Sequence, residues 1–175
     1  NHQQWPSAAK LTDGSYVVTW VSTGQDGSGD GVYAQRYANN GEALGPEFRV
    51  NSLTGGAQDW PQITGLTTGD YVITWQDVGN DGSGYGVYGQ RYNASGVAQG
   101  VQFQIHTATS GTQYHDNIAA YSSGFTGVWS TSSDIYLQRF DNTGTKIGPE
   151  TLVSTVVGGG TAQSGAQYVP DAATL

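Results

Sequence analysis

Two runs of aromatic and β-branched residues, at 71–75 and 86–92, set the pattern of the chain. A loop rich in Asp, Asn, Gly and Ser, residues 76–85, joins them. Residues 16–37 repeat this arrangement closely, and residues 125–140 repeat it with a shorter loop. Short runs of this kind, of roughly four to eight residues between Gly and Asp turns, are typical of β-strands. The pattern therefore predicts three related β-hairpins.

The hairpin belongs to a longer repeat, and this repeat gives the chain its organisation. The tryptophan that closes the second run recurs 55 and then 54 residues on, as Trp20, Trp75 and Trp129. A Gln-Arg-aromatic triplet recurs with it, at 35–37, 90–92 and 138–140. We therefore divide the chain into repeats at 1–57, 58–112 and 113–166, followed by the first strand of a fourth repeat at 167–175.

Each repeat is expected to form four short antiparallel strands, which in the second repeat fall at 62–66, 71–75, 86–92 and 103–107. Neither face of these strands is plainly polar, since alternate residues such as Ile73 and Val72 are apolar on opposite faces. A sheet that needs cover on both faces fits a β-propeller blade. The predicted fold class is all-β, with three complete blades and the start of a fourth. A β-sandwich or stacked-sheet array is the alternative, and a trefoil is the third.

The number of repeats bears on how such a propeller would close. A ring needs roughly four to eight blades, and this sequence holds three and the start of another. Either the sequence is part of a longer array, or two or more chains assemble to complete the ring. In both cases we expect the blades to contact further copies of the repeat, in the same chain or in a homo-oligomer.

Composition and charge exclude several classes of partner. The chain has no cysteine, so it can form neither disulfides nor thiolate metal sites. Its formal charge of −8 argues against nucleic acid, because phosphate binding requires a basic face. No apolar run approaches the roughly 18 residues of a membrane span, and we expect no membrane insertion.

One family resemblance follows from the order of these motifs. The first repeat reads DGSYVVTWVSTGQDGSGDGVYAQRY over 13–37, and EFRVN follows at 47–51. This resembles a repeat of very large secreted bacterial proteins, including RTX-type calcium-binding adhesins, and the resemblance covers 1–155. It implies a secreted or cell-surface location and a role in adhesion or matrix binding. The G-G-x-G-x-D nonapeptide of true RTX calcium rolls is absent, so that calcium chemistry does not carry over.

The loops that join the second and third strands offer a candidate calcium site. Ca²⁺ takes six to eight oxygen ligands from carboxylates, amides, carbonyls and water, and glycine lets carbonyls turn inward. The candidate ligands are Asp26 and Asp30 in the first repeat and Asp77, Asn80 and Asp81 in the second. The alternative is that these loops are only glycine-rich hairpin turns held by Asx hydrogen bonds.

A candidate ligand-binding surface lies where each repeat begins. Trp5 and Trp60 stand at the junction of a loop and the first strand, with Asp59 beside the second of them. An exposed ring can stack on a sugar while a carboxylate binds its hydroxyls. The tryptophans that close the second strands are instead expected in the core. The once-per-repeat arginines, Arg36, Arg91 and Arg139, are expected to pair with carboxylates or carbonyls between sheets.

Catalysis finds little support in the sequence. Its three histidines, at positions 2, 106 and 115, show no metal-ligand spacing, and no G-x-S-x-G elbow is present. We therefore expect a non-enzymatic, secreted or cell-surface repeat module of a larger bacterial protein, with a binding or structural role toward a glycan or surface protein. The alternatives are a lectin-like propeller closed by oligomerisation and the propeller domain of a secreted glycan-active enzyme.

Overall fold

The computed structural model describes residues 2–154, of which 115 and 116 are described only for their backbone. The predicted fourth repeat, 167–175, lies outside the described residues. Those residues form no helix, so none could cross a membrane as one. They form twelve strands: β1 (Gln3–Lys10), β2 (Tyr16–Thr23), β3 (Asp30–Tyr37), β4 (Phe48–Arg49), β5 (Gln58–Gly65), β6 (Tyr71–Val78), β7 (Tyr85–Tyr92), β8 (Ala98–Gln104), β9 (Tyr114–Tyr121), β10 (Gly124–Ser130), β11 (Ile135–Asp141) and β12 (Lys146–Leu152).

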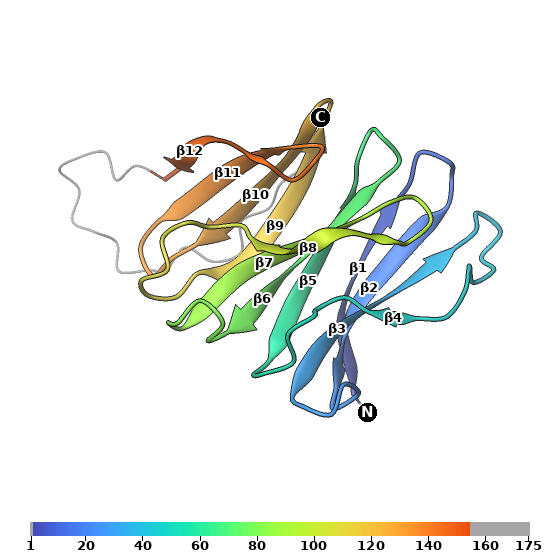
Figure 1. Cartoon of the computed structure of the whole chain (residues 1–175), viewed down its shortest axis with the longest axis horizontal. Helices are drawn as coiled ribbons and strands as arrows, with labels where there is room; N and C mark the ends of the chain where they lie inside the picture. Colours follow the sequence, from blue (N-terminus) through green and yellow to red (C-terminus); the bar gives the residue numbers. More distant parts are fainter. Residues whose placement is uncertain (1, 155–175) are drawn as a thin grey trace.

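The strands form three antiparallel sheets of four, each made by one repeat in simple sequential order. We call them blade 1 (β1–β4), blade 2 (β5–β8) and blade 3 (β9–β12). They fan out side by side along the chain (Figure 1). The first strands of blades 2 and 3 pack on the preceding blade, with β5 against β1, β2 and β3 and β9 against β5, β6 and β7. This is the propeller-type arrangement that the sequence predicts.

The hairpin at the centre of each blade is the most regular element. In blade 2 the pairing of β6 with β7 runs without interruption from Tyr71↔Tyr92 to Val78↔Tyr85. The first strands differ, because β1 and β5 each shift register near their start. The shift in β5 falls between Asp59 and Gln62 and includes a tryptophan and a proline. An irregularity of this kind redirects side chains at the end of a strand.

Blade 2 is buried on both faces. In β6, Tyr71, Ile73 and Trp75 join the core cluster shared with blade 1, whereas Val72 joins the cluster shared with blade 3. Seven of the eight residues of β6 are buried. A sandwich sheet would show one apolar and one polar face, so this burial fits the propeller-type alternative.

A repeated arginine links neighbouring blades. Arg36 donates through Nη1 to the carbonyl of Ser95 at 2.9 Å, and Arg91 donates through Nη1 to the carbonyl of Thr143 at 2.7 Å. Each bond runs from the third strand of one blade to a turn of the next. The predicted pairing of these arginines with carbonyls between sheets is therefore confirmed at two positions.

The predicted core role of the tryptophans is correct for two of the three. Trp75 and Trp129 are 0% and 2% exposed, respectively. Trp20 is only half-buried. The sequence-based prediction is wrong there because no described blade packs on the face of blade 1 that carries this ring.

Candidate functional site

The loops between second and third strands and the linkers between blades share one rim. In the linker into blade 2, the carbonyl of Ala57 accepts a hydrogen bond at 3.1 Å from the backbone N–H of Val78, at the end of β6. The linker into blade 3 donates from Gln113 N to Tyr85 O at 2.8 Å, at the start of β7. Candidate residues from neighbouring repeats therefore lie close together at this rim.

Asp26 and Asp81 form the Asx turns that the alternative interpretation of these loops predicts. Asp26 Oδ1 accepts from Ser28 N and Asp81 Oδ1 accepts from Ser83 N, each at 3.0 Å. The second carboxylate oxygen, Oδ2, is buried in both residues and has no hydrogen-bond partner among the described residues. These loops are therefore turns, and each also holds a buried oxygen that remains available to a ligand.

Asp77 and Asn80 lie together, whereas Asp30 lies in blade 1, at the start of β3. Asn80 Nδ2 donates to Asp77 Oδ1, and Asp30 Oδ1 accepts from Thr23 Oγ1 at 2.5 Å. Asp77 is 0% exposed. Burial raises its pKa to about 6, against the hydrogen bond from Asn80 and the nearby indole N–H of Trp75, which both lower it. The charges of Asp81 and Asp59 raise this pKa further, because like charges nearby disfavour ionisation.

The predicted calcium ligands are therefore divided between two loops. Among the side chains that the structure describes, which exclude those of residues 115 and 116, no group of three or more His, Asp or Glu is placed to hold a metal ion. At the loop of blade 2, the Oδ2 atoms of Asp77 and Asp81, which accept no hydrogen bond from the described residues, are the donors that fit a hard cation. Backbone carbonyls or water would have to complete the shell, and calcium stays a prediction.

His106 is a rim residue that the sequence analysis missed. It is 1% exposed, and its Nε2 lies 3.8 Å from Asp81 Oδ2. Its Nδ1 lies 2.9 Å from the carbonyl of Ala108, and burial lowers its pKa. Asn51 holds the same place in blade 1 and accepts from Val32 N at 2.9 Å. Aligning the repeats residue by residue would have shown this replacement.

The candidate ligand-binding tryptophans lie against one another. The rings of Trp5 and Trp60 stack with centroids 4.6 Å apart and planes 15° apart. Their backbones have φ of 50° and 51°, and they are the only non-glycine residues among those described with positive φ. A bulky residue in this region costs roughly 1–3 kcal/mol and is found mainly where structure or function requires it. Trp60 is still 38% exposed.

Asp59 precedes Trp60 and is 7% exposed. Its Oδ1 accepts from Gln76 Nε2 at 3.0 Å. Burial raises the pKa of this carboxyl, the bond from Gln76 lowers it, and the charge of Asp30 raises it. The three predicted ligand-binding residues thus lie together where blades 1 and 2 meet.

Comparisons with known proteins agree with the fold. No protein-family model matches the chain, and no curated protein matches it in sequence. Among solved structures it is similar to an α-L-arabinofuranosidase from Podospora anserina, solved in complex with cellotriose, with a TM-score of 0.52 and 10% identity. The alignment covers 86% of this chain and 50% of the arabinofuranosidase, so the chain spans half of that protein's length.

Two further structures are similar at lower scores. An endo-arabinase from Bacteroides thetaiotaomicron matches with a TM-score of 0.48 and 17% identity, covering 89% of this chain and 57% of that one. A protein of unknown function from Dyadobacter fermentans matches with a TM-score of 0.44 and 9% identity, covering 86% and 69%. At these identities the likeness concerns the fold alone. The chain is an all-β, propeller-type repeat protein.

Proposed function

We propose that this chain is a non-enzymatic binding module of a secreted or cell-surface protein, and that its ligand is a carbohydrate bound at Trp60. The observation that carries the proposal is the stacked Trp5–Trp60 pair, held at positive φ on the first strands of two blades. Core packing alone does not explain this pair, because both backbones are strained and one of the rings stays exposed. The arrangement does present a flat apolar surface to a ligand.

The surroundings of this ring suit a sugar. A pyranose offers an apolar face to an aromatic ring and a rim of hydroxyls to polar groups. Asp59 and Gln76 form a hydrogen-bonded pair beside the tryptophans. Rigid strands hold all of these groups at a rim of loops, which is where binding sites commonly lie. The RTX-type resemblance supports the secreted location, and the propeller-type fold supports the arrangement of the rim.

The proposal is tested by carbohydrate binding of the intact chain and of Trp60→Ala. A glycan array is followed by calorimetry with the best ligand, and cellotriose, the ligand named with the similar arabinofuranosidase, is a useful first probe. We expect Trp60→Ala to weaken binding about tenfold or more, since an aromatic contact contributes about 0.5–1.5 kcal/mol beyond its buried area.

The matched control is Val101→Ala, which truncates an apolar side chain that is 82% exposed on the outer strand β8. It should leave binding unchanged, and circular dichroism should show both variants folded. Binding that is equal in Trp60→Ala and the intact chain would contradict the proposed site. Hydrolysis of the bound sugar would contradict the non-enzymatic part and favour the alternative of a glycan-active enzyme.

Calcium at the loop of blade 2 is the second part of the proposal. The Oδ2 atoms of Asp77 and Asp81 are its protein ligands. A cation that binds only the folded state stabilises it by RT ln(1 + [cation]/Kd), so the melting temperature rises with the cation concentration. Millimolar CaCl₂ should raise it and EDTA should reverse the rise, and Asp81→Asn should abolish the response. Asp134→Asn, in the shortened loop of blade 3, should retain it. A melting temperature that does not change with calcium would contradict calcium binding at this loop.

A further inference from the structure

The two interfaces between described blades are built in the same way. At each, the tryptophan-bearing face of one blade packs on the arginine-bearing face of the blade before it. Trp75 and Tyr88 of blade 2 pack with Val17 and Val32 of blade 1. Trp129 of blade 3 belongs in the same way to the cluster that holds Val72 and Val87 of blade 2.

A glycine turn seats the arginine at both interfaces. A Cβ built on Gly96 would lie 2.9 Å from Cδ of Arg36, and one built on Gly144 would lie 2.9 Å from Cδ of Arg91. Both glycines also have positive φ, at 86° and 83°. The arginine stem therefore lies across the turn while its guanidinium bonds the carbonyl of the preceding residue, which is Ser95 or Thr143.

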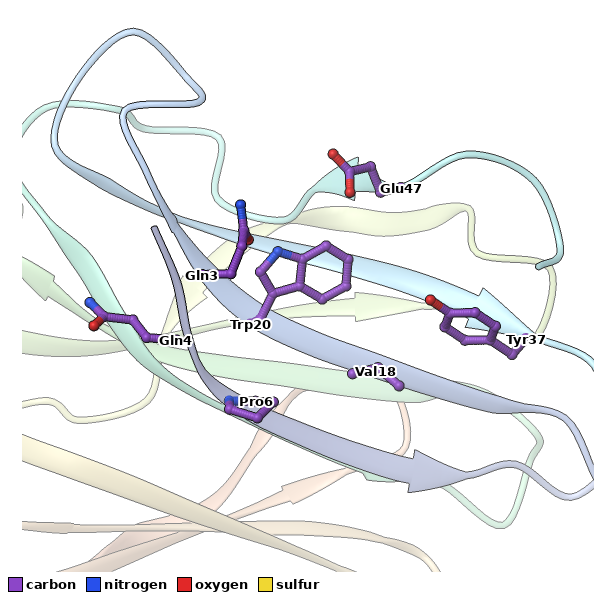
Figure 2. A pocket seen from close by; sticks show the side chains of 7 residues that line it. All are labelled: Gln3, Gln4, Pro6, Val18, Trp20, Tyr37 and Glu47. Carbon is purple, nitrogen blue, oxygen red and sulfur yellow. The ribbon is translucent and has the colours of Figure 1, made fainter. Parts of the chain in front are cut away.

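Blade 1 has the same glycine turn, but no arginine side chain among the described residues lies across it. Gly41 holds the matching position with φ of 90°, and only Tyr16 Oη comes within 4 Å of its Cβ position. The neighbouring face, which we call the Trp20 face, consists of Tyr16, Val18, Trp20 and Tyr37, all only half-buried. A hollow of about 540 Å³ lies on it (Figure 2), lined by Trp20, Val18, Tyr37 and Glu47 among others.

Blade 3 presents the complementary surface, which we call the Arg139 face. Arg139 is exposed and pairs with Thr126, as Arg91 pairs with Val72 and Arg36 with Val17. Leu137 lies opposite Val128 on the same face. Val153 is 50% exposed and donates to the carbonyl of Ile135 at 2.8 Å, the bond that the core residues Val50 and Ile105 make in blades 1 and 2.

We infer that the Trp20 face is the docking surface for the Arg139 face of a second copy of this chain. The new interface continues the two interfaces already present, with Arg139 lying on the Gly41 turn and donating to the carbonyl of Asn40. Trp20 becomes buried as Trp75 is. The contact is heterologous, since each copy uses one face as receptor and the other as donor, and such contacts close into rings or continue as chains.

The experiment is sedimentation-velocity ultracentrifugation of the full chain over a concentration series, with two variants. Trp20→Glu blocks the receptor face, and Arg139→Glu blocks the donor face by placing a carboxylate against a carbonyl. We expect the intact chain to self-associate and each variant alone to associate at least tenfold more weakly. Because Arg139 is exposed, its replacement should leave the fold intact, and circular dichroism checks both variants.

Mixing the two variants tests directly whether the Trp20 face binds the Arg139 face. The mixture contains one intact pair of faces, the Trp20 face of the Arg139→Glu chain and the Arg139 face of the Trp20→Glu chain. We expect the mixture to form heterodimers. The inference is overturned if the intact chain is a monomer at all concentrations, if neither variant weakens association, or if the mixture stays monomeric while the intact chain associates.

Discussion

At the scale of single residues, the rim is made of side chains that replace one another between repeats. Gly31 and Gly86 keep the same role, because the Asp26 or Asp81 carboxylate lies 2.9 or 3.0 Å from the position of a Cβ. Asn51 and His106 hold one place with different chemistry. The two loops therefore have the same Asx turn but differ in the side chain packed under it, which is Asn51 in blade 1 and His106 in blade 2.

Gly86→Ala should destabilise the protein by roughly 1–3 kcal/mol, the usual cost of overpacking. Its Cβ would meet His106 Nε2 at 2.9 Å, Asp81 Oδ2 at 3.0 Å and Tyr88 Cε2 at 3.1 Å. Gly55→Ala is the control, since nothing lies within 4 Å of that Cβ position. Urea unfolding measures both free energies, and equal values for the two variants would count against the close packing under the loop.

Asp77→Asn should make the protein more stable than the intact chain at neutral pH. Burial raises the pKa of Asp77 in the folded state to about 6, above its ordinary value of 3.8. The folded state therefore holds a proton that the unfolded state releases, and stability present below pH 4 is lost as the pH rises through 6. The asparagine does not titrate, so the advantage of the variant should grow over this range by on the order of 1–3 kcal/mol.

Unfolding in urea at a series of pH values between 4 and 8 measures this difference. Asp81 and Asp59 are the acidic neighbours that contribute to the shift, and His106, two residues beyond the end of β8, faces Asp81. Asp77→Ser, which introduces the residue that blade 1 has as Ser22, removes the same carboxyl and should show the same pH profile. A difference between the intact chain and both variants that stays constant over this range would contradict the buried titration.

At the scale of elements, the sequence predicts the hairpins well and the outer strands poorly. The predicted runs 71–75 and 86–92 lie within β6 and β7, since the two strands are neighbours in sequence and pair directly. The fourth strand predicted at 103–107 is instead Ala98–Gln104, and its counterpart in blade 1 is only Phe48–Arg49. An outer strand pairs on one edge only, so its apolar pattern specifies its limits weakly.

The cost of removing the repeated tryptophan should depend on the blade. Trp75→Ala should destabilise by about 3–5 kcal/mol, the usual cost of emptying a buried aromatic site. Trp20→Ala should cost less than half as much, because Trp20 is half-buried whereas Trp75 is 0% exposed. Thermal and urea unfolding at low protein concentration compare the two. A larger effect at Trp20 would show that its face is covered within a single chain.

At the scale of the whole molecule, stability should be highest in the middle. Blade 2 shares one core cluster with blade 1 and another with blade 3, whereas the clusters of the outer blades lie on one face. In a repeat array, stability depends on the interfaces between neighbours. Blades 1 and 3 each have only one described neighbour, so we expect them to be less stable than blade 2.

Native-state hydrogen exchange should accordingly be slowest in β6. Its backbone amides lie between two buried faces, whereas β2 has three half-buried residues and β10 has two. Exchange followed by mass spectrometry on peptides from the three hairpins measures the order of protection. Faster exchange in β6 than in both counterparts would contradict this account of the array.

The sequence by itself determined the repeat, the hairpins and the presence of apolar residues on both faces of the sheets. These depend on pairing between neighbouring segments and on apolar residues at alternate positions, both of which are visible in one dimension. It also predicted the arginine bonds between blades from their recurrence.

Only the tertiary structure decided which of these equivalent residues are buried and which meet. The contact between Trp5 and Trp60 joins positions 55 residues apart, and it depends on how two sheets pack. The same packing buries Trp75, leaves Trp20 half-buried and brings His106 to Asp81. Repeats of nearly the same sequence differ here because burial is a property of neighbours, and each blade has different ones.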